Sequence, residues 1–229
     1  MFGISPADWV ALQLTLRLAL ISTVLLLVLC VPLAWWLAFT SQRLKMVVEA
    51  LVALPLVLPP TVIGFYLLIL LGPRGAVGGW LEQIGVGHLA FTFTGLVVGS
   101  MAYSLPFVVQ PLQNAFQSLG RRPLEVAATL RAGPFDRLWS VVWPLARRGF
   151  LTAAVMSFAH TLGEFGVLLM LGGAIPGQTQ VASIAIYSHV EAMDYASAHA
   201  LSALLLVMAF VMLLSVYALN RRFRVGVSW

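Results

Sequence analysis

The sequence has very few charged residues. Lys, Arg, Asp and Glu make up 9% of its 229 residues, whereas soluble domains contain about 25%. It has a single cysteine, Cys30, which lies inside an apolar run and therefore cannot support a disulfide framework within the chain. Together with 61% hydrophobic residues and a mean hydropathy of +0.97, this scarcity of charge excludes a soluble globular domain and indicates an integral membrane protein.

The uncharged runs are long enough to cross a bilayer, which takes about 20 mostly apolar residues per helix. Five runs qualify: Leu18–Phe39, Ala50–Leu71, Leu89–Leu119, Gly149–Leu171 and Ala200–Leu219. A secretory signal needs a positive segment before its apolar core, but the start carries Asp8 and no base before Arg17. We therefore expect the first run to remain in the mature protein.

The net charge of +5 is concentrated in alternate connections between these runs. Nearly all the basic residues lie in segments that share one side if every run crosses: Arg43, Lys45, Arg121, Arg122, Arg131, Arg137, Arg147, Arg148, Arg221, Arg222 and Arg224. Because cytoplasmic loops carry an excess of Lys and Arg, we predict an external N-terminus and a cytoplasmic C-terminus. Membrane topology thus accounts for the positive net charge. We expect the chain to be surrounded by the lipid bilayer and not to bind nucleic acid.

The second run contains helix-breaking residues, among them Pro59, Pro60 and Gly64. A broken helix at membrane depth either borders a pathway or is a packing kink, and both interpretations stay open. In the outer connections, short helices are expected around Trp80–Ile84 and Val181–Tyr187, the latter too short to span a membrane.

The polar stretch LEVAATLRAGPFDRLW, from Leu124 to Trp139, separates two apolar runs. Pro123 suits the first turn of a helix and Glu125 complements its dipole. We expect that helix to end at Gly133 in the left-handed conformation, with a second helix beginning at Pro134. The segment is either a solvated arginine loop that fixes topology or a docking surface for another protein.

The order Glu125, Ala127, Ala128, Gly133 resembles the cytoplasmic "EAA" loop of the membrane subunits of ABC importers, with Val126 departing from the usual alanine. The resemblance implies that these four residues couple the chain to an ATP-binding subunit. The chain itself has no G-x-x-x-x-G-K-[ST] phosphate loop, since its only lysine follows Leu44. ATP and magnesium are accordingly expected in the partner subunit, and no cofactor in this chain.

Further motifs resemble the permease subunits of molybdate transporters: LPLVLPPTVIGFYLLILLG, then RG at Arg74, TLGEFG from Thr161 and IPGQT from Ile175. This implies an all-α integral membrane protein of type I ABC importer architecture, with about five transmembrane helices. Residues 1–229 would form one permease domain, with a coupling loop at about 120–148. The implied partners are a second copy of the chain, two ATP-binding subunits and a periplasmic molybdate-binding protein at the bacterial inner membrane. Tungstate and sulfate remain alternative cargoes.

Glu164 is the one acidic residue inside an apolar run, where a charge costs about 2.5–3.5 kcal/mol on insertion scales. His160, four residues earlier where related permeases often have arginine, is expected to pair with it on one helix face. The pair either gates the pathway or only fixes its helix, and we favour the structural role. The residues placed at the pathway or its gate are Pro59, Pro60, Gly64, His160, Gly163 and Glu164. Hydroxyls that could contact an anion, at Thr61, Ser100, Ser104 and Ser157, are not assigned a role.

Two other classes of function compete with an importer. An intramembrane enzyme would use His160 and Glu164, but the H-E-x-x-H zinc motif is missing, so we expect neither catalytic nor metal-binding residues. An ATP-independent carrier built from paired halves would show an internal repeat, and we find none.

Overall fold

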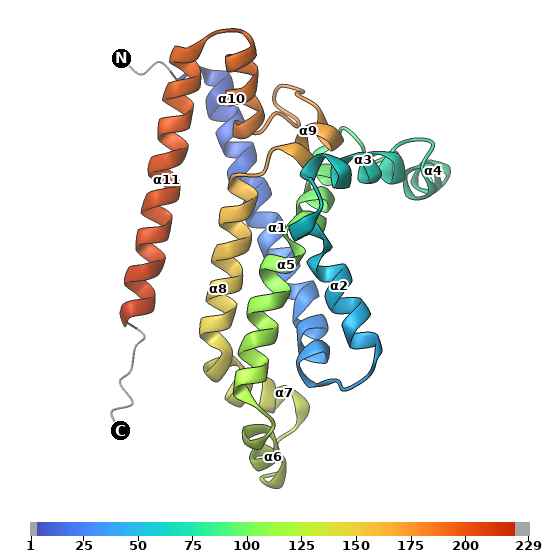
Figure 1. Cartoon of the computed structure of the whole chain (residues 1–229), viewed down its shortest axis with the longest axis vertical. Helices are drawn as coiled ribbons and strands as arrows, with labels where there is room; N and C mark the ends of the chain where they lie inside the picture. The colour runs from blue at the N-terminus through green and yellow to red at the C-terminus, as the bar shows by residue number, and fades with distance from the viewer. Residues whose placement is uncertain (1–3, 223–229) are drawn as a thin grey trace.

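The computed structural model describes residues 4–222, and the regular structure within that range is entirely helical. The elements are α1 (Pro6–Phe39), α2 (Leu44–Val57), α3 (Pro60–Leu71), α4 (Ala76–Gln83), α5 (Phe93–Leu119), α6 (Arg122–Thr129), α7 (Pro134–Arg137), the π-helical turn η1 (Leu138–Val142), α8 (Trp143–Leu162), α9 (Gly166–Gly172), α10 (Ala182–Glu191) and α11 (Tyr195–Arg222). Figure 1 shows α1, α5, α8 and α11 running lengthwise, with α6 and α7 at the lower end. Arg224 lies outside the described residues.

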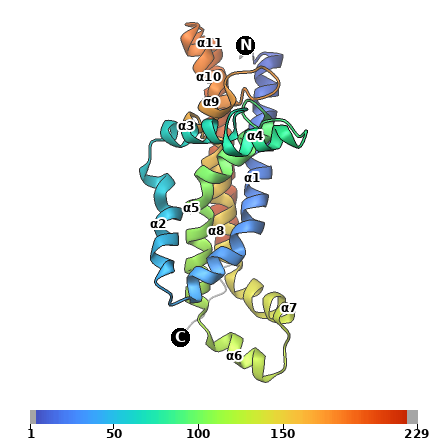
Figure 2. The same cartoon turned by 90° about the vertical axis from the view of Figure 1, so that its right-hand side faces the viewer.

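Helices α1, α5 and α8 form the centre of the molecule. Helix α1 begins at a capping box, in which the Asp8 amide donates to Ser5 Oγ (3.1 Å) and the Ser5 amide donates to the Asp8 carboxylate (3.1 Å). The buried core includes Leu26 and Leu37 from α1 together with Leu112 and Phe116 from α5. This packing holds α1, α5 and α8 side by side, as Figure 2 shows from a second direction.

The prediction of about five membrane spans is confirmed by helix length and composition. Four helical stretches are long and apolar enough by themselves: Pro6–Phe39, Pro60–Gln83, Phe93–Leu119 and Tyr195–Ser215. A fifth is a broken span, Phe135–Leu162 with Gly166–Gly172, bent by 61°. The first and last helices also extend beyond the apolar runs that predicted them.

The second predicted run is divided at Pro59 into α2 and α3. Helix α2 runs along the bundle, whereas α3 lies across it (Figure 1). Proline disfavours the helical conformation in the residue before it, and here Leu58 precedes Pro59, which precedes Pro60. Leu58 and Pro59 are accordingly extended, with ψ of 139° and 138°. The predicted break is confirmed, and a single straight span over Ala50–Leu71 is excluded.

The expectation of a continuous fourth helix over Gly149–Leu171 is wrong. Helix α8 ends at Leu162 in a tight turn, where the Gly163 amide donates to the His160 carbonyl (3.1 Å) and the Glu164 amide to the Thr161 carbonyl (3.3 Å). Helix α9 starts only at Gly166. Glu164 therefore lies in the break and does not share a helix face with His160.

Both short helices predicted in the outer connections are present, as α4 and α10. Helix α10 is tied to α1 by two contacts: the Ala182 amide donates to Thr15 Oγ1 (2.8 Å), and His189 Nε2 lies 2.8 Å from Asp8 Oδ1. It is thus packed along the first helix at the upper end of the molecule (Figure 1).

Candidate functional site

The segment with the four predicted coupling residues projects below the bundle as α6 and α7 (Figures 1 and 2). Two short helices were predicted and are confirmed, but the residue that ends α6 is different. Arg131 has the positive φ (59°), whereas Gly133 is not left-handed. The Arg131 amide donates to the Ala128 carbonyl (3.0 Å) and the Ala132 amide to the Ala127 carbonyl (3.1 Å), which is the Schellman pattern. These bonds fix the left-handed position two residues before Gly133.

The predicted coupling residues differ in what they can contact. Ala127 is buried against the fold, while Glu125 and Ala128 are exposed. Exposed apolar side chains flank them, with Val126 61% and Leu130 78% accessible. A surface that combines an acidic residue, a small residue and exposed apolar side chains is suited to contact with another protein rather than with water alone.

One arginine contact joins this segment to the end of α1, and a second lies within the segment. Arg121 Nη2 donates to the Phe39 carbonyl (2.8 Å), and Arg137 Nε donates to the Ala132 carbonyl (2.7 Å). A pocket of about 280 Å³ lies between α1 and α6, lined by Trp35, Phe39, Arg121, Leu124, Glu125, Ala128 and Arg137. The segment is therefore attached to the bundle in a defined orientation.

At the other end of α8, Glu164 takes part in a buried polar contact with α5. Its side chain is 3% exposed, and its Oε2 accepts a hydrogen bond from Ser100 Oγ (2.7 Å), while Oε1 has no partner. The Ser183 hydroxyl donates to the Glu164 carbonyl (2.7 Å). The carboxyl group thus connects the α8–α9 break to α5, and its backbone connects the break to α10.

His160 has its own partners, so the expected pair with Glu164 does not form. His160 Nδ1 lies 2.9 Å from Ser104 Oγ, which is also 3.2 Å from Thr161 Oγ1. The imidazole stacks on Phe107 (centroids 4.1 Å apart) and approaches Tyr103 (4.8 Å). Ser100 and Ser104 are one helical turn apart, so one face of α5 engages both residues.

Of the remaining predicted pathway residues, Pro60 and Gly64 lie where α3 packs on α9. A Cβ added at Gly64 would lie 2.7 Å from the Met170 Cβ, and one added at Gly166 would lie 2.9 Å from the Pro60 Cβ. Pro59 precedes this contact as the residue before α3. Gly163 lies in the break itself, where a Cβ would meet only the His160 carbonyl, at 3.8 Å. The structure therefore places Pro60 and Gly64 against α9, the helix that follows Glu164.

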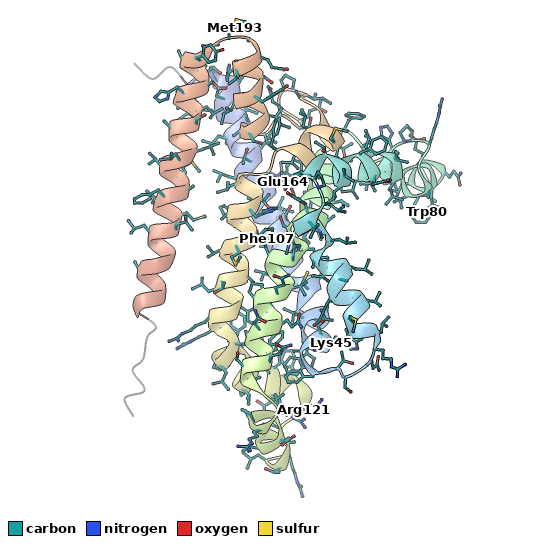
Figure 3. All side chains as sticks on the ribbon, viewed as in Figure 1. Lys45, Trp80, Phe107, Arg121, Glu164 and Met193 are labelled. Atoms are coloured by element: carbon teal, nitrogen blue, oxygen red, sulfur yellow. The ribbon has the colours of Figure 1, made fainter. Side chains whose placement is uncertain are left out.

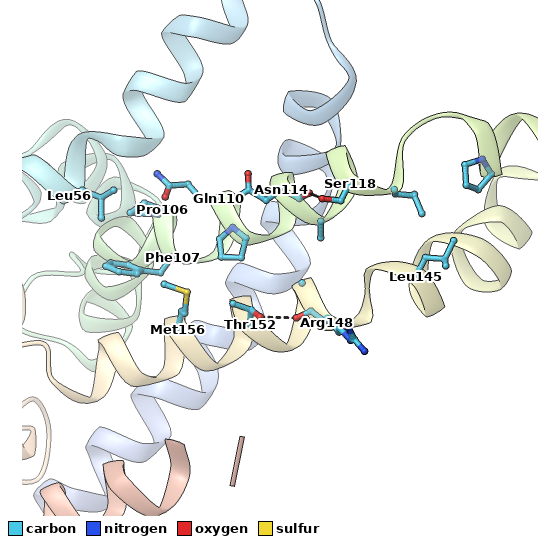
Figure 4. A pocket seen from close by; sticks show the side chains of 15 residues that line it. Leu56, Pro106, Phe107, Gln110, Asn114, Ser118, Leu145, Arg148, Thr152 and Met156 are labelled. Atoms are coloured by element: carbon cyan, nitrogen blue, oxygen red, sulfur yellow. Dashed lines mark hydrogen bonds between the residues drawn. The ribbon is translucent and has the colours of Figure 1, made fainter. Parts of the chain in front are cut away.

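A groove between α5 and α8, with Leu56 of α2 at its margin, was not predicted from the sequence (Figure 4). Its volume is about 780 Å³. Gln110, Asn114 and Ser118 line it from α5 at intervals of four residues, and Arg148 and Thr152 line it from α8. The four-residue spacing was a visible signal, but only the pairing of α5 with α8 makes it the wall of a groove.

Most of the residues that line this groove are apolar, but five carry polar side chains and none is acidic, and we call it the polar groove. Two hydroxyls are bonded along their own helices: Ser118 Oγ donates to the Asn114 carbonyl (2.8 Å) and Thr152 Oγ1 to the Arg148 carbonyl (2.9 Å). The side-chain amides of Gln110 and Asn114 are exposed and offer N–H donors. With Arg148 as the one charged lining residue, these donors can bind an anion transiently.

Candidate anion-contacting hydroxyls from the sequence are mostly engaged within the fold. Ser100 and Ser104 belong to the contacts around Glu164 and His160, and Ser157 lies 3.4 Å from Thr23 Oγ1. Thr61 is exposed at the start of α3. Within residues 4–222 no cluster of three or more His, Cys, Asp or Glu side chains could hold a metal ion.

Comparisons with known proteins agree with this arrangement. Residues 30–225 match the family described as binding-protein-dependent transport system inner membrane component. The chain is 58% identical over 225 residues to the molybdenum transport system permease protein of Azotobacter vinelandii, covering 98% of this chain and 99% of that protein. It is 32% identical over 225 residues to a probable sulfate transport system permease protein of Nephroselmis olivacea, covering 96% and 78% of the two chains.

The fold also matches a solved structure. A bacterial ABC transporter that imports the acidic polysaccharide alginate superposes with a TM-score of 0.78 at 20% identity, covering 96% of this chain and 80% of that one. The resemblance seen in the sequence motifs is thereby confirmed at the level of the family and of the fold. This chain belongs to the binding-protein-dependent transport system inner membrane components, the multi-pass permease subunits of ABC importers.

Proposed function

We propose that this chain is the permease of a molybdate importer. The observation that carries the proposal is the 58% identity, over nearly the whole of both chains, with a molybdenum transport permease, against 32% with a sulfate permease. Tungstate has a similar size and the same charge, so it is the second cargo to be tested. The proposed complex contains two copies of this chain, two ATP-binding subunits that carry ATP and magnesium, and an external binding protein.

The charge distribution supports an external N-terminus. Lys45 and Arg121 lie at the lower end of the molecule, whereas Met193 lies at the upper end (Figure 3). Asp8 and Asp194, near the N-terminus and in the α10–α11 connection, belong to that upper end, where both approach His189. Because basic residues favour the cytoplasmic side, the lower end with α6 and α7 faces the ATP-binding subunit.

The groove between α5 and α8 is proposed as one wall of the translocation pathway, completed by the second copy. An oxyanion that enters it meets the amides of Gln110 and Asn114 and then the positive charge of Arg148. Transport requires weak binding at several positions, because cargo that is held tightly is not released. Strong selection is therefore assigned to the external binding protein.

Coupling follows from how α6 is connected. Helix α5 ends at Leu119 and only two residues separate it from α6, which begins at Arg122, while α7 continues through η1 into α8. A displacement of Glu125, Ala128 and their neighbours by a closing ATP-binding subunit is thus transmitted to both walls of the groove. The contacts of Ser100 with Glu164 and of Ser104 with His160 keep the far ends of these walls together.

The experiment is ATP hydrolysis by the complete complex in vesicles, with molybdate-, tungstate- or sulfate-loaded binding protein added. We expect molybdate-loaded protein to stimulate hydrolysis and sulfate-loaded protein to leave the basal rate unchanged. Glu125→Ala should remove the stimulation without preventing insertion of the chain, whereas Glu82→Ala, an exposed acid at the opposite end, should retain it. Stimulation by sulfate-loaded protein alone would overturn the assignment of molybdate as the cargo. Stimulation that survives Glu125→Ala would overturn the coupling role of Glu125.

A further inference from the structure

A second groove, of about 960 Å³, lies between α1 and the region from η1 to α8. Apart from two arginines, every lining residue is apolar or aromatic: Val24, Leu27, Val28, Val31, Leu138, Trp139, Trp143, Phe150, Leu151 and Ala154. Val24 and Val28 are 51% and 67% exposed, although both lie in the middle of a membrane-spanning helix. At that depth an apolar concavity is filled by hydrocarbon or by protein.

The lower mouth of this groove carries aromatic side chains in a row. Phe135, Trp139 and Trp143 follow one another at intervals of four residues, with ring centroids 6.2 and 5.9 Å apart, and Trp143 continues to Phe150 at 5.0 Å. Trp139 is 55% exposed and Trp143 46%. Tryptophan is enriched where the hydrocarbon meets the headgroups, which places this mouth at the membrane–water interface.

The charged side chains that line the groove are of one sign. Arg147 and Arg148 are the charged lining residues, and no acidic side chain lines the groove. Asp136, on the neighbouring α7, is not part of the lining and accepts a hydrogen bond from Ser140 Oγ (2.7 Å). Arg147 is exposed, and a guanidinium has five N–H donors, so it can bind a phosphate in addition to its other interactions. An ammonium headgroup, by contrast, has no carboxylate partner here.

Helix α8 lies between this groove and the polar one, and of its residues only Arg148 lines both. Leu145, Gly149, Thr152 and Met156 line the polar groove, while Trp143, Arg147, Phe150 and Ala154 line the apolar groove. With 100° between successive residues, these two sets lie on opposite faces of α8. A second copy that closes the polar groove therefore approaches the other face, and the apolar groove is left to the bilayer.

We propose that the apolar groove binds an anionic phospholipid of the cytoplasmic leaflet. Its acyl chains lie along Val24, Val28 and Ala154, and its phosphate is bound at Arg147 between the two tryptophans. Basic pockets next to spanning helices recognise anionic headgroups by this combination of charge and apolar surface. Because η1 forms one wall, the lipid contacts the connection between α7 and α8.

Quenching of tryptophan fluorescence by brominated lipids tests the site on the purified full-length chain in mixed micelles. The signal of Trp139 and Trp143 is the difference between the wild type and a Trp139→Phe/Trp143→Phe variant. We expect half-maximal quenching at a mole fraction about fivefold lower for brominated phosphatidylglycerol than for brominated phosphatidylcholine, the preference that one arginine near an anionic headgroup provides. Filling the groove with Ala154→Phe should weaken quenching by both lipids.

Arg147→Gln is the decisive variant, and Arg43→Gln is its matched control, because Arg43 is an exposed arginine at the same end but outside the groove. The fivefold preference should disappear in the first and persist in the second. Equal quenching by both lipids in the wild type, or a preference retained in Arg147→Gln, would overturn the site. Absence of quenching by either lipid would show that protein covers the groove. None of these readouts requires cargo, so their failure leaves the molybdate proposal unaffected.

Discussion

Glu164 is a buried carboxyl group whose side chain has one hydrogen bond within the described part of the chain, the 2.7 Å contact with Ser100, and there its second oxygen has no partner. We predict that Glu164→Gln remains close to the wild type in stability, because the amide oxygen still accepts from Ser100. Glu164→Ala leaves the buried Ser100 hydroxyl without its acceptor and should destabilise the fold by about 1–3 kcal/mol. Thermal unfolding of the detergent-solubilised chain measures both changes.

Ser100→Ala provides the control for this assignment. In the Glu164→Ala background it should cost little, because the bond has already been lost; independent costs of the two substitutions would contradict the contact. Transport by Glu164→Gln separates the two roles left open by the sequence. A stable but inactive variant would assign a functional role to the carboxyl group, whereas an active one supports the structural role.

Helices α5 and α8 pack closely at Gly149 and Ala115. A Cβ added at Gly149 would lie 2.3 Å from the Ala115 Cβ, so any larger side chain pushes these helices apart. We predict that Gly149→Leu costs about 1–3 kcal/mol, the usual range for overpacking, and widens the polar groove. Gly133→Ala is the matched control, since a Cβ there meets nothing within 4 Å. Equal melting temperatures for both variants would contradict tight packing between α5 and α8.

Much of the helical order follows from the sequence, because apolar runs and prolines act locally. The spanning helices α1, α5 and α11, the break at Pro59 and Pro60, and the two short helices after α5 were predicted in this way. The break between α8 and α9 was missed because apolar residues continue on both sides of Glu164, and the break depends on bonds with Ser100 and Ser183 from other helices. The left-handed residue is Arg131 rather than Gly133, because hydrogen bonding to Ala127 and Ala128 selects the position.

The candidate site was less predictable from the sequence, because most of it depends on contacts between helices. Glu125 and Ala128 belong to a local motif, and both prove to be exposed. The polar groove needs Gln110 and Asn114 of α5 to face Thr152 of α8, and a single sequence does not specify which helices pair. Contacts with other helices also explain why His160 and Glu164 do not pair, although their spacing of four residues predicted that they would.

For the whole molecule, orientation decides whether these parts can work together. If the lower end is cytoplasmic, α6 and α7 meet the ATP-binding subunit, the polar groove reaches the cytoplasmic end at Pro123, and the lipid site lies in the anionic leaflet. In the opposite orientation, the coupling segment, the cytoplasmic end of the polar groove and the lipid site would all lie on the external side. The alternating distribution of arginine favours the first arrangement.

Cysteine labelling tests that orientation directly, because the only native cysteine, Cys30, is 2% exposed and gives little background. Val86→Cys, in the exposed connection after α4, should react with a membrane-impermeant maleimide in intact spheroplasts. Gln42→Cys, in the exposed connection between α1 and α2, should react only after permeabilisation, because the bilayer separates it from the reagent. Labelling of Gln42→Cys alone in intact spheroplasts would reverse the topology, and with it the assignment of α6 as the coupling helix.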